Sequence, residues 1–234
     1  MCIEVKYGIW NVTQPEMGSV NALVSCGYSP LSAMILASRG IHNQAEATNY
    51  LSCNTPLLDP FLMTDMDLAA GRVGLAMSRG EKIAVFGDYD VDGITATCLL
   101  TDFLRRHGAD VVSYIPGRLE EGYGLNPIAI DYLHGLGVKL IITVDCGITA
   151  VGYPHKNLSG VGVAFKLAAA LAGDQEEVLK EYADMVCLGT VADVMPLQGE
   201  NRVFVSQGLE SLRNTKRPGI AALMAESGCA SDNL

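Results

Sequence analysis

Short apolar runs alternate with amphipathic stretches in the middle of the chain. Apolar runs at 81–87, 111–115 and 138–145 are bounded by turn-forming or charged residues, and their length predicts buried strands. The stretches between them, 94–107 and 126–137, have apolar residues at helical spacing, which predicts helices. Strand–helix–strand–helix–strand with short connections indicates right-handed crossovers and a parallel sheet.

Helical spacing dominates both flanks of this region. Ser29 and Pro30 are a predicted helix cap and first helical position, and the sequence after Val161 is again helical in pattern. We therefore expect an α/β fold: a parallel-sheet domain with helices on both faces, a helical N-terminal segment and a helical C-terminal part. We divide the chain into residues 1–80, a helical segment packed on the core, and residues 81–234, the domain with the sheet.

Aspartates follow two of the predicted strands. Asp88, Asp90 and Asp92 occupy alternate positions in FGDYDVDG, directly after the first strand, and Asp145 ends the third. Ligands of parallel sheets collect outside the carboxyl ends of the strands. If the two strands are neighbours, four carboxylates converge on one site.

The chemistry of such a group of acids depends on what neutralises it. Buried carboxylates must be protonated, paired or bound to metal, and FGDYDVDG contains no lysine or arginine. Oxygen ligands suit hard divalent cations. A solvated turn is the alternative, because aspartate and glycine are common turn residues. A helix-loop-helix calcium site does not fit, since a strand precedes the loop and Leu99 stands where that site needs a glutamate.

Two further stretches carry candidate chemistry. In IPGRLEEGYGLN, Arg118 is a forked donor suited to phosphate oxygens, and Gly122 and Gly124 let the backbone approach a ligand. An ordinary surface loop is equally compatible with this stretch. In LGTVADVMPL, Asp193 lies at an apolar helix end, as either a cap or a ligand.

Composition narrows the class of protein. Hydrophobic residues make up 49% and charged residues 18% of the chain, which is typical of a globular protein. The net charge of −10 argues against a non-specific nucleic-acid coat protein, although bound metals would reverse the field around a carboxylate site. Seven cysteines without a CxxC pattern, and no signal peptide or apolar run of ~18 residues, lead us to expect a cytoplasmic protein without membrane contact.

Taken together, GDYDVDG, IPGRLEEGYG, TVDCGIT and GTVADVMPL closely resemble, in order and neighbours, the RecJ single-strand-specific exonucleases of the DHH phosphoesterase superfamily. The resemblance extends from about residue 30 to the end. It implies a DHH-type domain and a 5′-to-3′ exonuclease that hydrolyses phosphodiester bonds of single-stranded DNA in recombination and repair. It also implies Mn²⁺ or Mg²⁺ in a two-metal site, and a single-strand-binding protein or a helicase as candidate partners.

The resemblance also implies roles for individual residues. The expected catalytic residues and metal ligands are Asp90, Asp92, Asp145 and Asp193, with Asp145 as the bridge between two ions. Asp88 is expected to be a further ligand or to lie next to the ligands. Arg118 and Gly122 are expected to bind the substrate. Two ions would generate a hydroxide at neutral pH and stabilise charge on the phosphoryl oxygens.

The chain departs from the family pattern in one segment. It has no Asp-His-His triplet, and no two of its four histidines are adjacent. In the family, TVDCGIT is followed by a helix, another strand and that triplet, so several tens of residues are missing here near 150–153. A crossover of ~10 or more residues is expected after the third strand, and GITAVGYPHKNLSG cannot supply it. Either the segment is unrepresented in this sequence, or the chain lacks two imidazole ligands; His155 is expected to be solvent-exposed rather than a substitute.

Two other functions stay open from the sequence. One is a catalytically impaired DHH scaffold that binds DNA or a partner without cleavage, which the missing histidines favour. The other is a DHH hydrolase of pyrophosphate or short dinucleotides, which the long N-terminal segment and the IPGRLEEGYG loop oppose. RecJ proteins continue into further domains, so we expect the catalytic core without its full DNA-binding surface.

Overall fold

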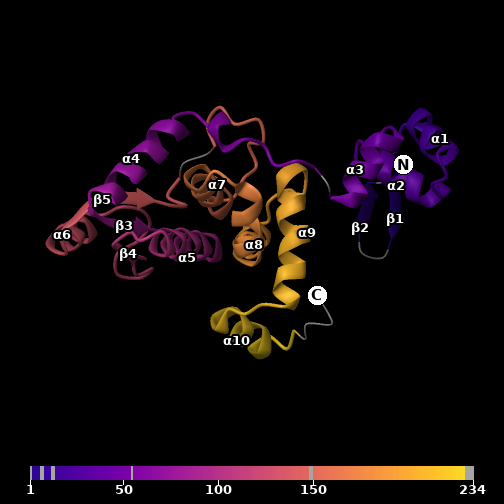
Figure 1. The fold of residues 1–234 in the computed structure, drawn as a ribbon. Helices are drawn as coiled ribbons and strands as arrows, with labels where there is room; N and C mark the ends of the chain where they lie inside the picture. The colour runs from indigo at the N-terminus through magenta and orange to yellow at the C-terminus, as the bar shows by residue number, and fades with distance from the viewer. Residues whose placement is uncertain (1, 6–7, 12–13, 54, 148–149, 230–234) are drawn as a thin grey trace. The chain divides into compact units, whose positions relative to one another are not determined.

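The computed structural model describes residues 2–5, 8–11, 14–53, 55–147 and 150–229. The chain divides into two compact units, Met1–Thr55 and Pro56–Leu234, and each is described by itself (Figure 1). Among the described helices, none is long and apolar enough to cross a membrane.

The first unit combines a small sheet with three helices. Strands β1 (Cys2–Val5) and β2 (Gly8–Asn11) pair antiparallel, and helices α1 (Met17–Ser25), α2 (Pro30–Ser38) and α3 (Gln44–Ser52) follow. As predicted, Ser29 caps α2 by accepting a hydrogen bond from the Ser32 amide. The strand pair and α1 were not predicted, so the N-terminal segment is not purely helical.

The second unit contains the predicted parallel sheet. Its strands within the described residues are β3 (Lys82–Phe86), β4 (Val111–Tyr114) and β5 (Val138–Thr143), in the order β4-β3-β5 with both pairs parallel. Helices α5 (Val91–Arg106) and α6 (Pro127–Gly135) connect them. The expected neighbourhood of the first and third strands is therefore confirmed.

Helices cover both faces of this sheet, as expected. Ile83 and Val85 point into the main core, which α5 and α7 (Gly160–Ala172) complete. The alternate residues Ala84 and Phe86 pack on the other face, in a cluster with Leu133 of α6. This two-residue alternation is the side-chain period of a strand.

The predicted C-terminal helices are also present. They are α7, α8 (Gln175–Ala192), α9 (Gly199–Arg213) and α10 (Pro218–Glu226). Helices α8 and α9 approach closely at Gly208, where an added Cβ would lie 2.2 Å from the Cβ of Cys187. Phe165 of α7 and Phe204 of α9 pack edge to face, with ring centroids 5.1 Å apart.

The boundary between the two units differs from the expected one. We expected the division at residue 80, whereas the units part between Thr55 and Pro56. The reason is that the short helix η1 (Pro60–Leu62) and helix α4 (Met66–Ser78) border the sheet domain. Met66 and Val73 are buried in the same core as β3.

The connection from β5 to α7 is short, as expected from the missing segment near 150–153. Within its described residues it contains neither a crossover helix nor a further strand. Strand β5 consequently lies at the edge of the sheet. We expected this apolar strand to be buried, but residues 140–143 are only half-buried.

A buried ion pair between α7 and α9 also binds a residue of this connection. Lys166 of α7 and Glu200 of α9 are almost fully buried, and the Lys166 Nζ lies 2.6 Å from the Glu200 carboxylate. The Tyr153 hydroxyl donates to the other Glu200 oxygen at 2.8 Å, and the Leu58 amide also donates to Glu200, at 2.9 Å. Because each charge has partners, the pair joins four segments without leaving an unpaired buried charge.

Candidate metal centre

The loop after β3 holds the first two aspartates of the site. Asp90 is the N-cap of α5, and its carboxylate accepts a hydrogen bond from the Gly93 amide at 2.9 Å. Asp88 is buried and lies against Gly93, where an added Cβ would come within 2.7 Å of the Asp88 backbone nitrogen. Gly93 therefore permits the tight turn that aims both carboxylates at the end of the sheet.

Asp145 reaches the same place from β5. Phe86 is paired with Thr143 in the sheet. Asp88 lies two residues after Phe86, and Asp145 lies two residues after Thr143, so both aspartates leave the sheet at the same level. The Asp145 backbone is in the left-handed region, with φ at 54°, a conformation that costs a non-glycine residue about 1 kcal/mol or more. Backbone strain of this kind is common at functional sites.

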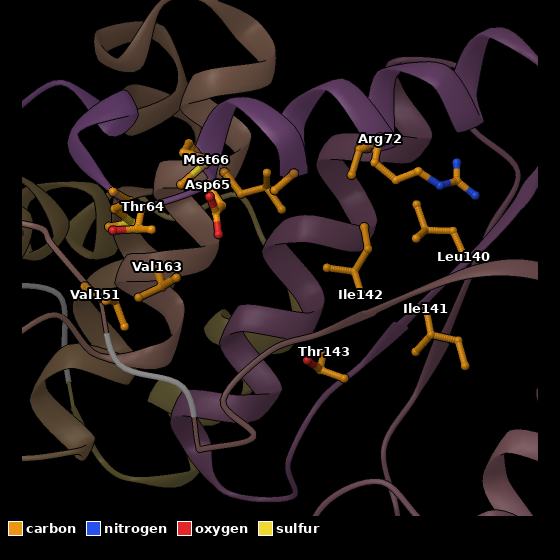
Figure 2. Close-up of a pocket in the computed structure, with 15 residues that line it drawn as sticks. Thr64, Asp65, Met66, Arg72, Leu140, Ile141, Ile142, Thr143, Val151 and Val163 are labelled. Carbon is orange, nitrogen blue, oxygen red and sulfur yellow. The ribbon is translucent and has the colours of Figure 1, made fainter.

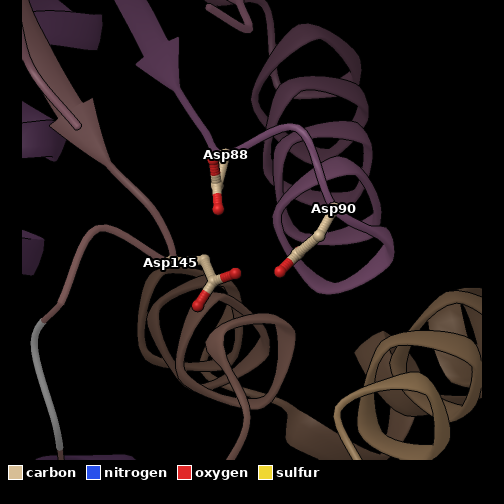
Figure 3. A group of neighbouring side chains, drawn as sticks. All are labelled: Asp88, Asp90 and Asp145. Atoms are coloured by element: carbon tan, nitrogen blue, oxygen red, sulfur yellow. The ribbon is translucent and has the colours of Figure 1, made fainter. Parts of the chain in front are cut away.

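These three aspartates form one group. A carboxylate oxygen of Asp88, one of Asp90 and one of Asp145 all lie within 4.8 Å of one another (Figure 3). The Asp88 Oδ1 atom is buried and has no hydrogen-bond partner among the described residues. A buried acceptor without a donor is rare in folded proteins, and a hard cation would satisfy it.

Burial and mutual repulsion make Asp145 a weak acid. Desolvation raises its pKa to about 7, and the charges of Asp92, Asp90, Asp193 and Asp88 contribute in the same direction. A carboxyl group surrounded by carboxylates keeps its proton unless a positive charge enters. The site therefore favours either a proton or a metal ion between its carboxylates.

Asp92 has a structural role in this arrangement. It is buried, and its two oxygens accept hydrogen bonds from the amides of Gly160, at 2.5 Å, and Val161, at 2.9 Å. Burial raises its pKa, while these two hydrogen bonds oppose the rise. Asp92 thus ties α5 to the first turn of α7, and it is not one of the three clustered carboxylates. Its role as a ligand stays a prediction.

Asp193 follows α8 as its C-cap residue and is exposed. It also lies outside the three-carboxylate group, but its charge helps to raise the pKa values of Asp92 and Asp145. The structure therefore places Asp193 at the border of the site, and its role as a ligand also stays a prediction.

The loop after β4 brings Arg118 to the loop that carries Asp88 and Asp90. Its guanidinium group lies 5.1 Å from the ring centroid of Tyr89, the residue between Asp88 and Asp90. The Glu121 carboxylate holds this loop by accepting from the Gly117 amide, at 2.9 Å, and from the Tyr114 hydroxyl, at 2.6 Å. A forked guanidinium donor of this kind suits phosphate oxygens.

Two further residues of the same loop shape the site: one sets the turn of the loop, and the other contacts the backbone of Asp145. Gly122 has a φ of 77°, which favours glycine. The Tyr123 hydroxyl donates to the carbonyl oxygen of Asp145 at 3.3 Å. Sequence reasoning missed Tyr123; its only signal was an aromatic residue between the two glycines of EGYG.

His155 is not solvent-exposed as expected. It is half-buried, its Nε2 atom is buried without a partner among the described residues, and an added Cβ at Gly199 would lie 3.0 Å from its Nδ1 atom. It does not belong to the carboxylate group. The ligand atoms that cluster here are therefore carboxylate oxygens, a donor set that fits Mg²⁺ or Mn²⁺.

Known proteins resemble this chain in sequence. Residues 82–158 match the model of the DHH family, N-terminal domain. The chain is 37% identical over 260 residues to the single-stranded-DNA-specific exonuclease RecJ of Bacillus subtilis (strain 168), covering 94% of this chain and 33% of that protein. It is 36% identical over 200 residues to RecJ of Thermus thermophilus, covering 68% of this chain and 29% of that protein.

Solved structures resemble its fold. A crystal structure of exonuclease RecJ bound to manganese matches with a TM-score of 0.65 and 32% identity, over 75% of this chain and 55% of that one. RecJ from Thermus thermophilus in complex with Mn²⁺ matches with a TM-score of 0.73 and 27% identity, over 94% of this chain and 37% of that one.

The match to the curated relatives is partial in two ways. This chain spans 33% of the Bacillus subtilis protein and 42% of the Salmonella typhimurium RecJ. The alignment with the Bacillus subtilis protein is 260 residues long, although this chain has 234. That relative therefore has internal residues with no counterpart here.

A Gly160→Ala variant should weaken metal binding. An added Cβ at Gly160 would lie 2.6 Å from the Cβ of Asp145 and 2.7 Å from its Oδ1 atom, so Asp145 must move. We expect the Mn²⁺ affinity, measured by isothermal titration calorimetry, to fall about tenfold or more. Gly162→Ala is the matched control in the same helix, because its nearest contact would be at 3.4 Å. Equal affinities for the two variants would contradict the described packing.

The metal-free protein should lose stability as the pH rises toward 7. Asp145 binds its proton with a pKa of about 7 when folded, against an ordinary value of 3.8, so its contribution is full at low pH and is lost as pH rises through 7. Between pH 5 and pH 8, Asp145→Asn should therefore lose less stability than wild type.

The expected difference is about 2–4 °C in melting temperature, the change that roughly 1 kcal/mol produces in a domain of this size. Melting in EDTA, followed by circular dichroism, measures it. Asp131→Asn is the control, because Asp131 is exposed on α6 and outside the group. Parallel pH profiles for wild type and Asp145→Asn would contradict the assignment.

Proposed function

The chain carries a RecJ-like core of the DHH family, and on this premise we propose that it is the catalytic core of a metal-dependent single-stranded-DNA exonuclease. It would hydrolyse phosphodiester bonds from the 5′ end, using Mn²⁺ or Mg²⁺. The observation that carries the proposal is the group formed by Asp88, Asp90 and Asp145, with its unpartnered buried oxygen on Asp88.

Each residue of the site has a proposed task. Asp88, Asp90 and Asp145 would hold divalent cations, and Asp145 must give up its proton to do so. When bound, two such ions supply a hydroxide at neutral pH and stabilise charge on the phosphoryl oxygens. Arg118, whose guanidinium group lies beside Tyr89, would bind a substrate phosphate through its forked donors.

The backbone around the site would restrict where these groups can lie. The Tyr123 hydroxyl holds the Asp145 carbonyl, and Gly122 gives the loop its turn. We propose Asp92 and Asp193 as further ligands. The charge of Asp193 acts on the group, because it helps to raise the pKa of Asp145. Asp92 would join only by sharing the oxygens that now accept from the α7 amides.

The missing Asp-His-His triplet supports a second candidate. With no adjacent histidines in the sequence, the ion-binding groups would be carboxylates, and affinity for Mn²⁺ would be lower than with imidazole ligands. An impaired scaffold that binds DNA or a partner without cleavage follows from that observation. A hydrolase of pyrophosphate or short dinucleotides is the third candidate, opposed by the Arg118 loop.

The cellular setting is also a proposal. A RecJ-like exonuclease acts on DNA, so we propose a cytoplasmic location and a part in recombination and repair. A single-strand-binding protein or a helicase would supply or expose the single-stranded substrate.

The function is tested with labelled single-stranded DNA and Mn²⁺. We expect release of labelled mononucleotides from 5′-labelled DNA, and Asp145→Asn should reduce the rate about 100-fold or more, because a ligand is lost. Asp131→Asn should cleave like wild type. The same reactions with 3′-labelled DNA and with pyrophosphate define polarity and substrate.

The outcomes separate the three candidates. DNA binding in a gel-shift assay without mononucleotide release would replace the nuclease by the scaffold. Cleavage of pyrophosphate alone would favour the third candidate. Cleavage that Asp145→Asn leaves intact would remove this site from the mechanism.

A further inference from the structure

The two edges of the parallel sheet differ in what lies beside them. An apolar groove of about 580 Å³ lies beside β5 and is lined by residues of β5, α4, α7 and the connection around Val151 (Figure 2). Because that connection is the shortened one, the groove belongs to the segment in which this chain departs from its family. Strand β4 lies at the opposite edge, and side chains that the chain itself supplies hold the loop after it.

Glu121 closes the turn that presents Arg118. Its amide donates to the carbonyl oxygen of Gly117 at 2.9 Å, and its carboxylate accepts from the amide of Gly117, also at 2.9 Å. The backbone and the side chain of one residue thus close the 117–121 turn from both directions, in the way that a capping box closes the first turn of a helix. Arg118 is the second residue of this turn and is exposed.

The second carboxylate oxygen of Glu121 ties the turn to two regular elements. It accepts from the Tyr114 hydroxyl at 2.6 Å and from the Asn126 side-chain amide at 3.2 Å. Tyr114 is the last residue of β4. Asn126 caps α6 by accepting from the Ala129 amide at 2.8 Å. The turn is therefore held between the end of a strand and the start of a helix.

The same network reaches the strand that leads to the carboxylate group. The Tyr114 ring stacks on Phe86, with ring centroids 5.3 Å apart and an interplanar angle of 15°, and Asp88 follows Phe86 by two residues. Arg118 lies over the Tyr89 ring, with its guanidinium carbon 5.1 Å from the centroid. The Arg118 turn is thus connected to the end of β3 both at its base, through Tyr114, and at its tip, through Tyr89.

Charge strengthens these hydrogen bonds. The hydrogen bond from the Gly117 amide, followed by that from the Tyr114 hydroxyl, lowers the pKa of Glu121, so this carboxylate is ionised at neutral pH. The hydrogen bond to Glu121 in turn raises the pKa of Tyr114 to about 12, so the hydroxyl keeps its proton. Hydrogen bonds to an ionised acceptor are shorter and stronger than those between neutral groups. The network therefore keeps its geometry throughout the neutral pH range.

We propose that Glu121 is a positioning residue, whose carboxylate holds the 117–121 turn so that the Arg118 guanidinium group meets a phosphate of single-stranded DNA at one fixed place. This inference rests on the proposed function, because it presupposes that Arg118 binds a substrate phosphate. An ordered turn reduces the conformational freedom that the loop would otherwise lose on binding. A loosened turn would therefore weaken substrate binding without removing any group that contacts the substrate or the metal.

The test compares Glu121→Ala with Glu120→Ala. Both variants remove one carboxylate from the same loop, but Glu120 is exposed and does not belong to the network. With Mn²⁺ and single-stranded DNA, Glu121→Ala should raise KM about tenfold at nearly unchanged kcat, as expected for the loss of one well-placed contact to a charged group. Glu120→Ala should cleave like wild type. All three proteins should bind Mn²⁺ with equal affinity in isothermal titration calorimetry.

A double-mutant cycle separates positioning from general stability. If Glu121 acts through Arg118, Glu121→Ala should change KM by only about twofold or less in an Arg118→Met background. A purely structural role would instead lower the melting temperature and add its full effect to that of Arg118→Met. Tyr114→Phe keeps the stacked ring and removes one donor to the Glu121 carboxylate. It should raise KM about threefold, which tests the network even if Glu121→Ala does not fold.

The outcomes distinguish this inference from the function on which it rests. Wild-type protein that neither binds nor cleaves single-stranded DNA would remove the proposed function, and the role of Glu121 with it. Where DNA is bound without cleavage, the dissociation constant from fluorescence anisotropy with fluorescein-labelled DNA takes the place of KM. Wild-type activity or binding that Glu121→Ala and Tyr114→Phe leave unchanged would overturn the role of Glu121 alone. An effect of Glu121→Ala that adds fully to that of Arg118→Met would do the same.

Discussion

Repulsion between carboxylates at the end of one parallel sheet is the constraint on which the rest of the second unit depends. The parallel pairing of β3 with β5 brings Asp88 and Asp145 to the same level, and the α5 cap adds Asp90. Burial and the neighbouring charges raise the pKa of Asp145 to about 7. The fold holds these groups together at a cost in stability that only a proton or a cation offsets.

Close helix packing makes that convergence possible. Gly93 and Gly160 leave space for Asp88 and Asp145, since a Cβ at either position would lie within 2.7 Å of the aspartate concerned. Asp92 ties α5 to α7 by accepting from the Gly160 and Val161 amides. The carboxylates are thus positioned by helix ends and small residues, and the buried Lys166–Glu200 pair holds the connection that leads from β5 to α7.

Much of this arrangement could be predicted from the sequence because it depends on local patterns. The strands around Val85 and Ile142, the Ser29 cap and the convergence of Asp88, Asp90 and Asp145 follow from periodicity and from the geometry of parallel sheets. Other features depend on tertiary contacts that no local pattern encodes. These are the α7 contacts of Asp92, the Tyr123 hydrogen bond, the half-burial of β5 and of His155, and the division at Thr55 rather than residue 80.

The most direct test of the account is the number of protons released when Mn²⁺ binds. Isothermal titration calorimetry at about pH 6.5, below the pKa of Asp145, in two buffers with different ionisation enthalpies, measures that number. Because the pKa of Asp145 is raised to about 7, Asp145 is mostly protonated at this pH, and we predict the release of the larger part of one proton per site, and almost none in Asp145→Asn. Binding with no proton release in the wild-type protein, or no binding of Mn²⁺ at all, would contradict the claim that these carboxylates are gathered to hold a cation.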